Sequence, residues 1–349
     1  MTRKALLLGV GCLVLLGAGC AGSSTPAVVD GGVYRTVDLA AHWTQPAVLV
    51  QSGKLGSIAN VSVASAAFDP QDPATMYVGT TQNGLLMTLD SGASWQQARG
   101  LETGEVGGVA VDPQDKCTVF VARANQIMKT ENCGRDWGQA YFDPRVAQVF
   151  TTVAISPQNT HVVYAGDADG DLIRTDDAGL SWRVLTRVEA RINKITIDPR
   201  NANIIYAATN GAGVLKTTDG GTTWRAINAS TDTFQARNPS MVVIDSANSN
   251  VLYLVSRNGL LRSEDAGGSW RALALPTPPA STNIRAFAVH PKNPKVLVYS
   301  TDTSVVLTAD LGVTWTPKKL PTTRSTSFLT FDEGPQNALF LGTIVRAAQ

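Results

Sequence analysis

Arginine recurs at one place in the repeated pattern of this chain. Five arginines lie 5–11 residues before a turn that follows an apolar strand. A sixth arginine lies four residues before one of these five arginines. The planar guanidinium binds carboxylate, phosphate and sulfate groups through paired hydrogen bonds. The alternative is that they are ordinary surface arginines. The candidates for an anion-binding site are Arg145, Arg187, Arg191, Arg237, Arg285 and Arg324.

A second group of candidate residues is acidic. Asp167, Asp169 and Asp171 alternate within one short turn, and alternating carboxylates are one arrangement that binds Ca²⁺. The EF-hand spacing fails, however, because Leu172 stands at the glycine position and Ala178 at the position of the bidentate glutamate. The pattern therefore favours a solvated turn.

Signatures of hydrolytic chemistry are weak. The chain has no Gly-x-Ser-x-Gly elbow and no His-Glu-x-x-His motif. Its three histidines lie too far apart for a local zinc site, so neither a metal nor another cofactor is expected. A glycosidase needs two carboxylates at a defined separation, and Glu102, Glu105 and Glu189 are the candidates in loops. A glycoside hydrolase therefore remains an alternative, without assigned catalytic residues.

The elements that position these residues follow from a seven-fold repeat. Every tryptophan ends a copy of the pattern Ser/Thr-x-Asp-x-Gly-x-x-Trp, at intervals of 42–52 residues. The aspartate can accept backbone N–H bonds within a turn, and the glycine supplies a positive φ. One copy has Asn132 for Asp and one has Ala40 for Gly. We predict a structural role for Asp38, Asp90, Asn132, Asp177, Asp219, Asp265 and Asp310, and for Trp43, Trp95, Trp137, Trp182, Trp224, Trp270 and Trp315.

Between these turns lies a second motif, an apolar strand, an Asp/Pro/Asn turn and another apolar strand. Each repeat therefore has four short strands, which is typical of a β-propeller blade. Seven repeats over residues 31–349 predict an all-β fold, a single seven-bladed propeller. The N-terminus reads as the third and fourth strands of a blade, and the C-terminus as the first and second. One composite blade would thus close the ring and remove its sheet edges.

The tryptophan-ended motif resembles the Asp-box, or bacterial neuraminidase (BNR), repeat. Sialidases, xyloglucan-active glycoside hydrolases, sortilin-type receptors and photosystem II assembly-factor propellers share this repeat, so the resemblance specifies fold more than function. Sialidases have six blades and sortilin-type receptors ten, and xyloglucanases hold substrate between two seven-bladed propellers. The assembly factors resemble this chain best, being seven-bladed, exported and Arg-bearing, but their Gly-Trp strand segments are missing. Such propellers place the arginine loops at the channel mouth and the Asp-boxes on the opposite face.

The N-terminus reads as an export signal. Arg3 and Lys4 precede an apolar stretch too short for a comfortable membrane span. The sequence up to Cys20 resembles a bacterial lipoprotein cleavage box, with Gly17 where Leu is usual. We expect residues 1–19 to be a signal peptide and residues 20–30 a lipidated Cys20 and tether, with ordinary secretion or a helical anchor as alternatives.

Two further cysteines, Cys117 and Cys133, would then lie in an oxidising compartment, which favours a disulfide. Cys117 begins the second strand of its repeat and Cys133 lies in the tryptophan-ended turn of the same repeat, so the two are expected to be close. This repeat is the one with Asn132 in place of Asp, and the disulfide is predicted to compensate.

The composition completes the functional interpretation. With 29 Lys plus Arg against 28 Asp plus Glu, the net charge is +1, which argues against nucleic-acid binding. We expect a monomeric lipoprotein of the bacterial cell envelope that touches the membrane only through its lipid. Its expected ligand at the channel mouth is an envelope protein, a peptide or an acidic glycan. A structural protein without a ligand is a further alternative.

Overall fold

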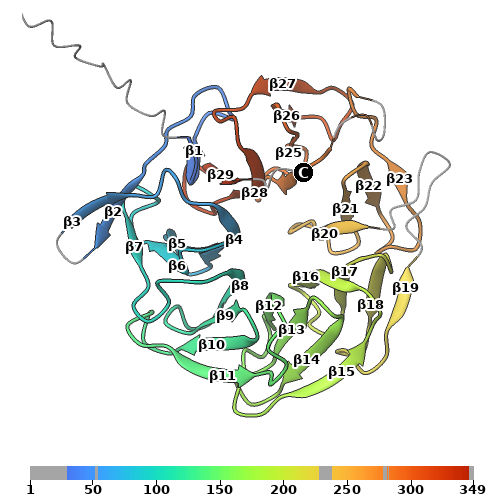
Figure 1. Ribbon diagram of the computed structural model, residues 1–349. Helices are drawn as coiled ribbons and strands as arrows, with labels where there is room; N and C mark the ends of the chain where they lie inside the picture. Colours follow the sequence, from blue (N-terminus) through green and yellow to red (C-terminus); the bar gives the residue numbers. More distant parts are fainter. Residues whose placement is uncertain (1–29, 52–53, 228–237, 278–280, 282, 346–349) are drawn as a thin grey trace, which may run out of the picture.

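The computed structural model describes residues 30–51, 54–227, 238–277, 281 and 283–345. These residues form 29 strands and no helix, and accordingly the described ranges contain no helix that could span a membrane. The strands build seven sheets that stand around a central channel (Figure 1). The predicted all-β, seven-bladed propeller is therefore confirmed.

Blades 1 to 6 follow one another along the chain, and in each the strands A, B, C and D run from the channel outward. Adjacent strands are antiparallel. Blade 1 contains β4 (Val63–Asp69), β5 (Asp72–Thr80), β6 (Leu85–Thr88) and β7 (Trp95–Gln97); blade 2 contains β8 (Val106–Val111), β9 (Val119–Arg123), β10 (Gln126–Thr130) and β11 (Gly138–Phe142); blade 3 contains β12 (Phe150–Ile155), β13 (Val163–Asp167), β14 (Asp171–Thr175) and β15 (Arg183–Arg187). Blade 4 contains β16 (Arg191–Ile197), β17 (Ile205–Asn210), β18 (Val214–Thr217) and β19 (Arg225–Ile227); blade 5 contains β20 (Pro239–Ile244), β21 (Leu252–Ser256), β22 (Gly259–Ser263) and β23 (Arg271–Ala272); blade 6 contains β24 (Ala286–Val289), β25 (Leu297–Ser300), β26 (Ser304–Thr308) and β27 (Thr316–Lys319).

Blade 7 joins the two ends of the chain. Its strands A and B are β28 (Ser325–Phe331) and β29 (Leu339–Ile344), and its strand C is β1 (Val33–Thr36). The fourth strand is reduced to Thr44, whose backbone exchanges two hydrogen bonds with Arg35, at 2.9 and 2.8 Å. The predicted closure is confirmed, because strands from the two ends of the chain pair with each other in this blade.

Blade 1 carries an addition that lies outside the repeat pattern. The hairpin of β2 (Val48–Gln51) and β3 (Lys54–Ser57) extends its outer edge, with β2 parallel to β7. The indole N–H of Trp95 donates to the carbonyl of Pro46 at 3.0 Å, and Trp95 is fully buried. The hairpin accounts for the 52-residue interval between Trp43 and Trp95, which exceeds the other intervals.

The tryptophan-ended turns share one set of hydrogen bonds. In blade 4 the Thr217 hydroxyl donates to Asp219 at 2.7 Å and accepts the Gly221 N–H at 3.0 Å. Asp219 in turn accepts the N–H and hydroxyl of Thr223, at 2.9 and 2.6 Å. Gly220 and Gly221 both have positive φ, 68° and 93°. The hydrogen bond from Thr217, followed by those from Thr223, lowers the pKa of Asp219 to about 2.

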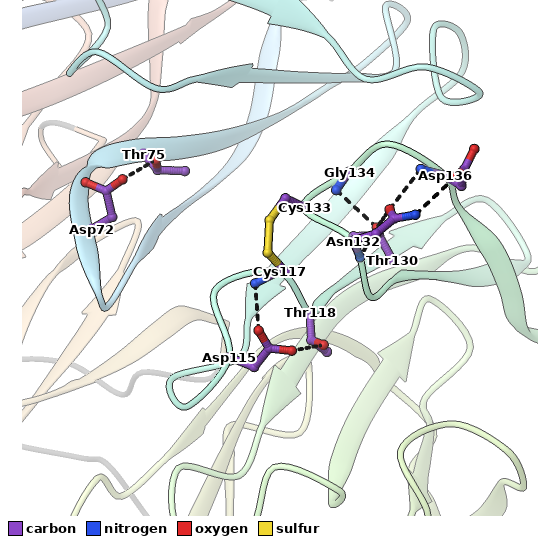
Figure 2. Close-up of a disulfide and its surroundings, with 10 residues drawn as sticks. All are labelled: Asp72, Thr75, Asp115, Cys117, Thr118, Thr130, Asn132, Cys133, Gly134 and Asp136. Atoms are coloured by element: carbon purple, nitrogen blue, oxygen red, sulfur yellow. Dashed lines mark hydrogen bonds between the residues drawn. A yellow bond between two sulfur atoms is a disulfide. The ribbon is translucent and has the colours of Figure 1, made fainter.

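The turn in blade 2 keeps these bonds despite its asparagine. Asn132 accepts the N–H of Asp136 at 3.0 Å, and its amide donates to the Asp136 carboxylate at 3.1 Å. The loss of the aspartate therefore needs no further compensation. Cys117 and Cys133 are joined by a disulfide (Figure 2). It adds to a backbone bond from Cys133 N–H to the Cys117 carbonyl, at 3.1 Å, that other blades have at the corresponding position.

Cations on strand C connect neighbouring blades. Lys216, just before the turn of blade 4, lies 5.3 Å from the centre of the Tyr206 ring, and its ammonium donates to the carbonyl of Ala266 in blade 5 at 2.7 Å. Tyr206 donates to the same carbonyl at 3.3 Å. This cation–aromatic pair is worth roughly 0.5–2 kcal/mol. The same pairing recurs at Arg35 with Phe340, Lys129 with Phe120, Arg174 with Tyr164, and Arg262 with Tyr253.

Candidate functional site

The channel wall is shaped by a recurring β-bulge near the start of strand A. The register shifts there in blades 1 to 5 and in blade 7, and a bulge re-aims the side chain that it contains. In blade 6 the corresponding position lies just before β24. All seven positions lie five residues before the turn that follows strand A. We call these residues, all of which line the channel, the bulge ring: Ala64, Gly107, Thr151, Asn193, Ser240, Arg285 and Ser327.

Two cavities meet at this ring. The channel cavity, of about 530 Å³, is lined by the bulge ring and by deeper strand A residues. The mouth cavity, of about 940 Å³, lies where strands A of blades 4 to 7 begin and strands B end. Asn193, Ser240 and Arg285 line both cavities. A ligand at the mouth can therefore extend a group into the channel.

The mouth cavity is polar and carries positive charge. Among the described residues, three arginines line it and no aspartate or glutamate does. Four side-chain amides can both donate and accept hydrogen bonds there. The residues that provide these groups are Arg191, Arg257, Arg285, Asn193, Asn210, Asn238 and Asn258.

The three arginines differ in their partners. Arg285 donates to Asp302 through Nε at 2.8 Å and Nη2 at 3.2 Å, and its side chain is only 15% exposed. Arg191 and Arg257 are exposed, and neither guanidinium makes a hydrogen bond or ion pair with the part of the chain that the structure describes. Two positive charges at the mouth thus lack a counterion within the described residues.

Arg145 and Arg187 serve a different purpose. Arg145 binds Asp143 at 2.6 Å and Asp171 at 2.8 Å, and Arg187 binds the same Asp171 through two hydrogen bonds. The bond from Arg187, together with Arg145, lowers the pKa of Asp171, whereas burial raises the pKa of Asp167. The interpretation of this segment as a solvated turn is wrong for Asp167 and Asp171, because both are buried.

The other candidates lie elsewhere. Arg324 donates to the carbonyl of Asn60 at 3.2 Å, and Arg237 lies outside the described residues, as does Cys20. Glu102, Glu105 and Glu189 are exposed and line neither cavity. Among the described residues no cluster of His, Cys, Asp and Glu is suited to hold a metal ion.

Two cationic residues of the cavities were missed from the sequence. Arg257 follows strand B directly, and a search of the loops before strand A does not reach it. Lys194 lies on β16 next to the bulge residue Asn193 and lines the channel cavity. A lysine within an apolar strand, Ile192 to Ile197, was the available signal.

The comparisons with known proteins agree with the fold. A family profile described as sortilin, neurotensin receptor 3, matches residues 214–338, a minor part of the chain. No curated protein matches the chain in sequence.

Solved structures give longer matches at low identity. The GH74 xyloglucanase from Xanthomonas campestris has a TM-score of 0.68 and 19% identity over 81% of this chain, which spans 51% of that enzyme. YCF48 bound to D1 peptide has a TM-score of 0.63 and 14% identity, over 81% of this chain and 93% of that one. The extracellular domain of a one-component system from B. thetaiotaomicron has a TM-score of 0.62 and 14% identity, over 81% and 37%. At these identities the likeness shows a seven-bladed propeller shared by enzymes and non-enzymatic proteins.

Proposed function

We propose that this chain is a non-catalytic propeller of the bacterial cell envelope that binds an anionic segment of a partner protein at its channel mouth. One observation carries the proposal. Arg191 and Arg257 line a cavity of about 940 Å³, and in the described part of the chain this cavity has no acidic lining residue and both guanidinium groups lack a partner. In a protein whose net charge is +1, such a cavity favours an anionic ligand by charge complementarity.

The four asparagines favour a peptide as the ligand. A side-chain amide presents both a donor and an acceptor, which matches the N–H and C=O groups of an extended backbone. The likeness in fold to YCF48, a propeller bound to a peptide, is in keeping with this choice. The rest of the proposal follows the sequence: Asp-box repeats, an exported monomer, and a lipid on Cys20 as the only membrane attachment.

Capture of partners from solubilised cell envelopes tests the proposal. The bait is the full chain, compared with a variant carrying Arg191→Glu and Arg257→Glu. Arg225→Glu is the matched control, because Arg225 is an exposed arginine on strand D of blade 4 and lines neither cavity. We expect a partner that the wild type and the control retain, that the double variant loses, and that salt weakens.

Equal recovery by all three baits would refute the mouth as the binding site. A captured species that resists protease but is degraded by glycan hydrolases would replace the peptide with an acidic glycan.

A glycoside hydrolase is the second candidate, because GH74 enzymes share the fold. Turnover of xyloglucan or another polysaccharide would support it, provided that Glu102→Gln or Glu189→Gln abolishes the activity. Because the described residues of the mouth cavity include no carboxylate, binding without hydrolysis is the better-supported function.

A further inference from the structure

Lys194 is a lysine without a counterion inside the propeller. It follows the bulge residue Asn193 on β16 and lines the channel cavity of about 530 Å³. Its ammonium makes no hydrogen bond or ion pair with any residue that the structure describes. The surrounding protein lowers the pKa of Lys194 through burial. Lys194 is half-buried, and a half-buried ammonium without a partner favours a bound anion.

The hydroxyl groups of the channel cavity are mostly occupied. Ser65, Thr151 and Ser240 donate to the backbone carbonyls of Val106, Gly166 and Val255 at 3.2, 3.0 and 3.2 Å. The exception is the bulge residue Ser327, whose hydroxyl is buried without a hydrogen-bond partner. At the mouth, the hydroxyl of Thr326 is likewise buried and unpartnered, and Thr326 is only 3% exposed. Neither of these two oxygens is open to solvent, so the free donor that the described residues offer in the channel cavity is the Lys194 ammonium.

The other charged residues of this cavity do not neutralise Lys194. Arg285 is positively charged and already paired with Asp302, and Glu333 is an exposed residue beside the turn that follows β28. No ion pair joins Lys194 to Glu333 within the described structure. An oxyanion with its hydrating water fits the cavity, since one water needs about 30 Å³ in the liquid.

We propose that the inner end of the bulge ring is an oxyanion site, in which Lys194 forms an ion pair with one carboxylate, phosphate or sulfate group. The site goes beyond the proposed function, because it can be filled by a free anion without any partner at the mouth. The shared residues Asn193, Ser240 and Arg285 also allow a mouth ligand to supply the anionic group.

Calorimetric titration of the full chain with inorganic sulfate, phosphate and acetate, at constant ionic strength, tests the site. We expect saturable binding of at least one anion. Lys194→Met should weaken it about tenfold or more, because it removes a charged hydrogen-bond donor. Lys194→Arg should restore part of the affinity. Lys319→Met, at an exposed position on β27, is the matched control and should bind like the wild type.

No anion binding by the wild type, or equal binding by wild type and Lys194→Met, would overturn the oxyanion site. Thermal melting of each variant shows that a lost signal is not lost folding, and the Lys194→Arg variant provides a second check. The double variant Arg191→Glu, Arg257→Glu distinguishes this oxyanion site from the proposed partner binding at the mouth cavity. Anion binding that survives in the double variant while partner capture fails supports a free anion as the source. Partner capture that also requires Lys194 supports a group presented by the partner.

Discussion

Removing the disulfide of blade 2 is expected to lower stability without changing the fold. Cys117 and Cys133 are 16 residues apart in sequence. Blades 3 and 5 hold the same two positions by a backbone bond alone, from Ala178 to the carbonyl of His161 and from Ala266 to that of Asn250, each at 2.8 Å. Because blade 2 has this bond as well, the native turn does not depend on the sulfur bridge. The disulfide should therefore stabilise the protein mainly by restricting the unfolded chain.

The magnitude follows from loop closure. Closing a loop of about 16 residues removes unfolded-state entropy worth about 3 kcal/mol at 25 °C. The unfolding entropy of roughly 320 residues, at about 2 cal/mol/K each, converts this into a decrease in Tm of about 4–5 °C. We therefore expect the variant with Cys117→Ser and Cys133→Ser to fold and to melt cooperatively a few degrees below the wild type.

Thermal and urea unfolding, followed by tryptophan fluorescence, measure the effect. Reductant should lower the Tm of the wild type to that of the double variant and leave the double variant unchanged. Partner capture should be equal for both, because the disulfide lies outside the cavities. Unchanged stability of the double variant would refute the loop-closure argument, and a variant that cannot fold would refute the claim that backbone bonds suffice.

Four other predictions concern the turns, the mouth and the closure. Because the pKa of Asp219 falls to about 2 from its ordinary 3.8, the stability that this turn contributes is complete above about pH 4 and is lost between pH 4 and 2. Acid titration followed by circular dichroism should show that the Asp219→Asn variant loses less stability over this pH range than the wild type. Leu39 is exposed and has a φ of 51°, so Leu39→Gly should raise the free energy of unfolding by about 0.5–1 kcal/mol in urea titrations, and a decrease would contradict this. Asp302→Asn should leave Arg285 without its carboxylate and tighten capture of an anionic partner by a few-fold; weaker capture would show that Arg285 needs this carboxylate for its position. Deleting residues 326–349 removes β29 and most of β28 and should prevent folding, whereas a soluble truncation that melts cooperatively would contradict closure by both ends.

The sequence predicts the repeat well because each blade repeats the same local hydrogen bonds. The Thr217 hydroxyl, the Asp219 carboxylate and the following glycines act within eight residues, so a linear pattern contains the whole turn. The β2–β3 hairpin breaks the repeat, and only a long interval between tryptophans indicates it. Its parallel pairing with β7 depends on tertiary packing that no local pattern encodes.

The binding site is less predictable, since an arginine's direction depends on a difference of one or two residues. Of the candidates, only Arg285 stands five residues before its turn, where the bulge aims side chains into the channel. Arg145 stands 11 residues before its turn and binds Asp143, a neighbour two residues away in sequence. The distance from arginine to turn varies from 5 to 11 residues, and this variation already indicated that the arginines do not all point to one place at the channel mouth.

The distribution of partners distinguishes structural charge from charge available to a ligand. Turn aspartates such as Asp219 are satisfied within their own turn, and strand C cations such as Lys216 bind a carbonyl of the next blade. These groups recur around the ring and stabilise it. Arg191, Lys194 and Arg257 break the repeat: they lie in the adjacent blades 4 and 5, line the mouth or channel cavity, and lack partners among the described residues. Within the described residues, the unpaired positive charge of the two cavities thus lies on one side of one opening, so an anionic ligand should bind off-centre, over blades 4 and 5, with its charged group directed toward the channel.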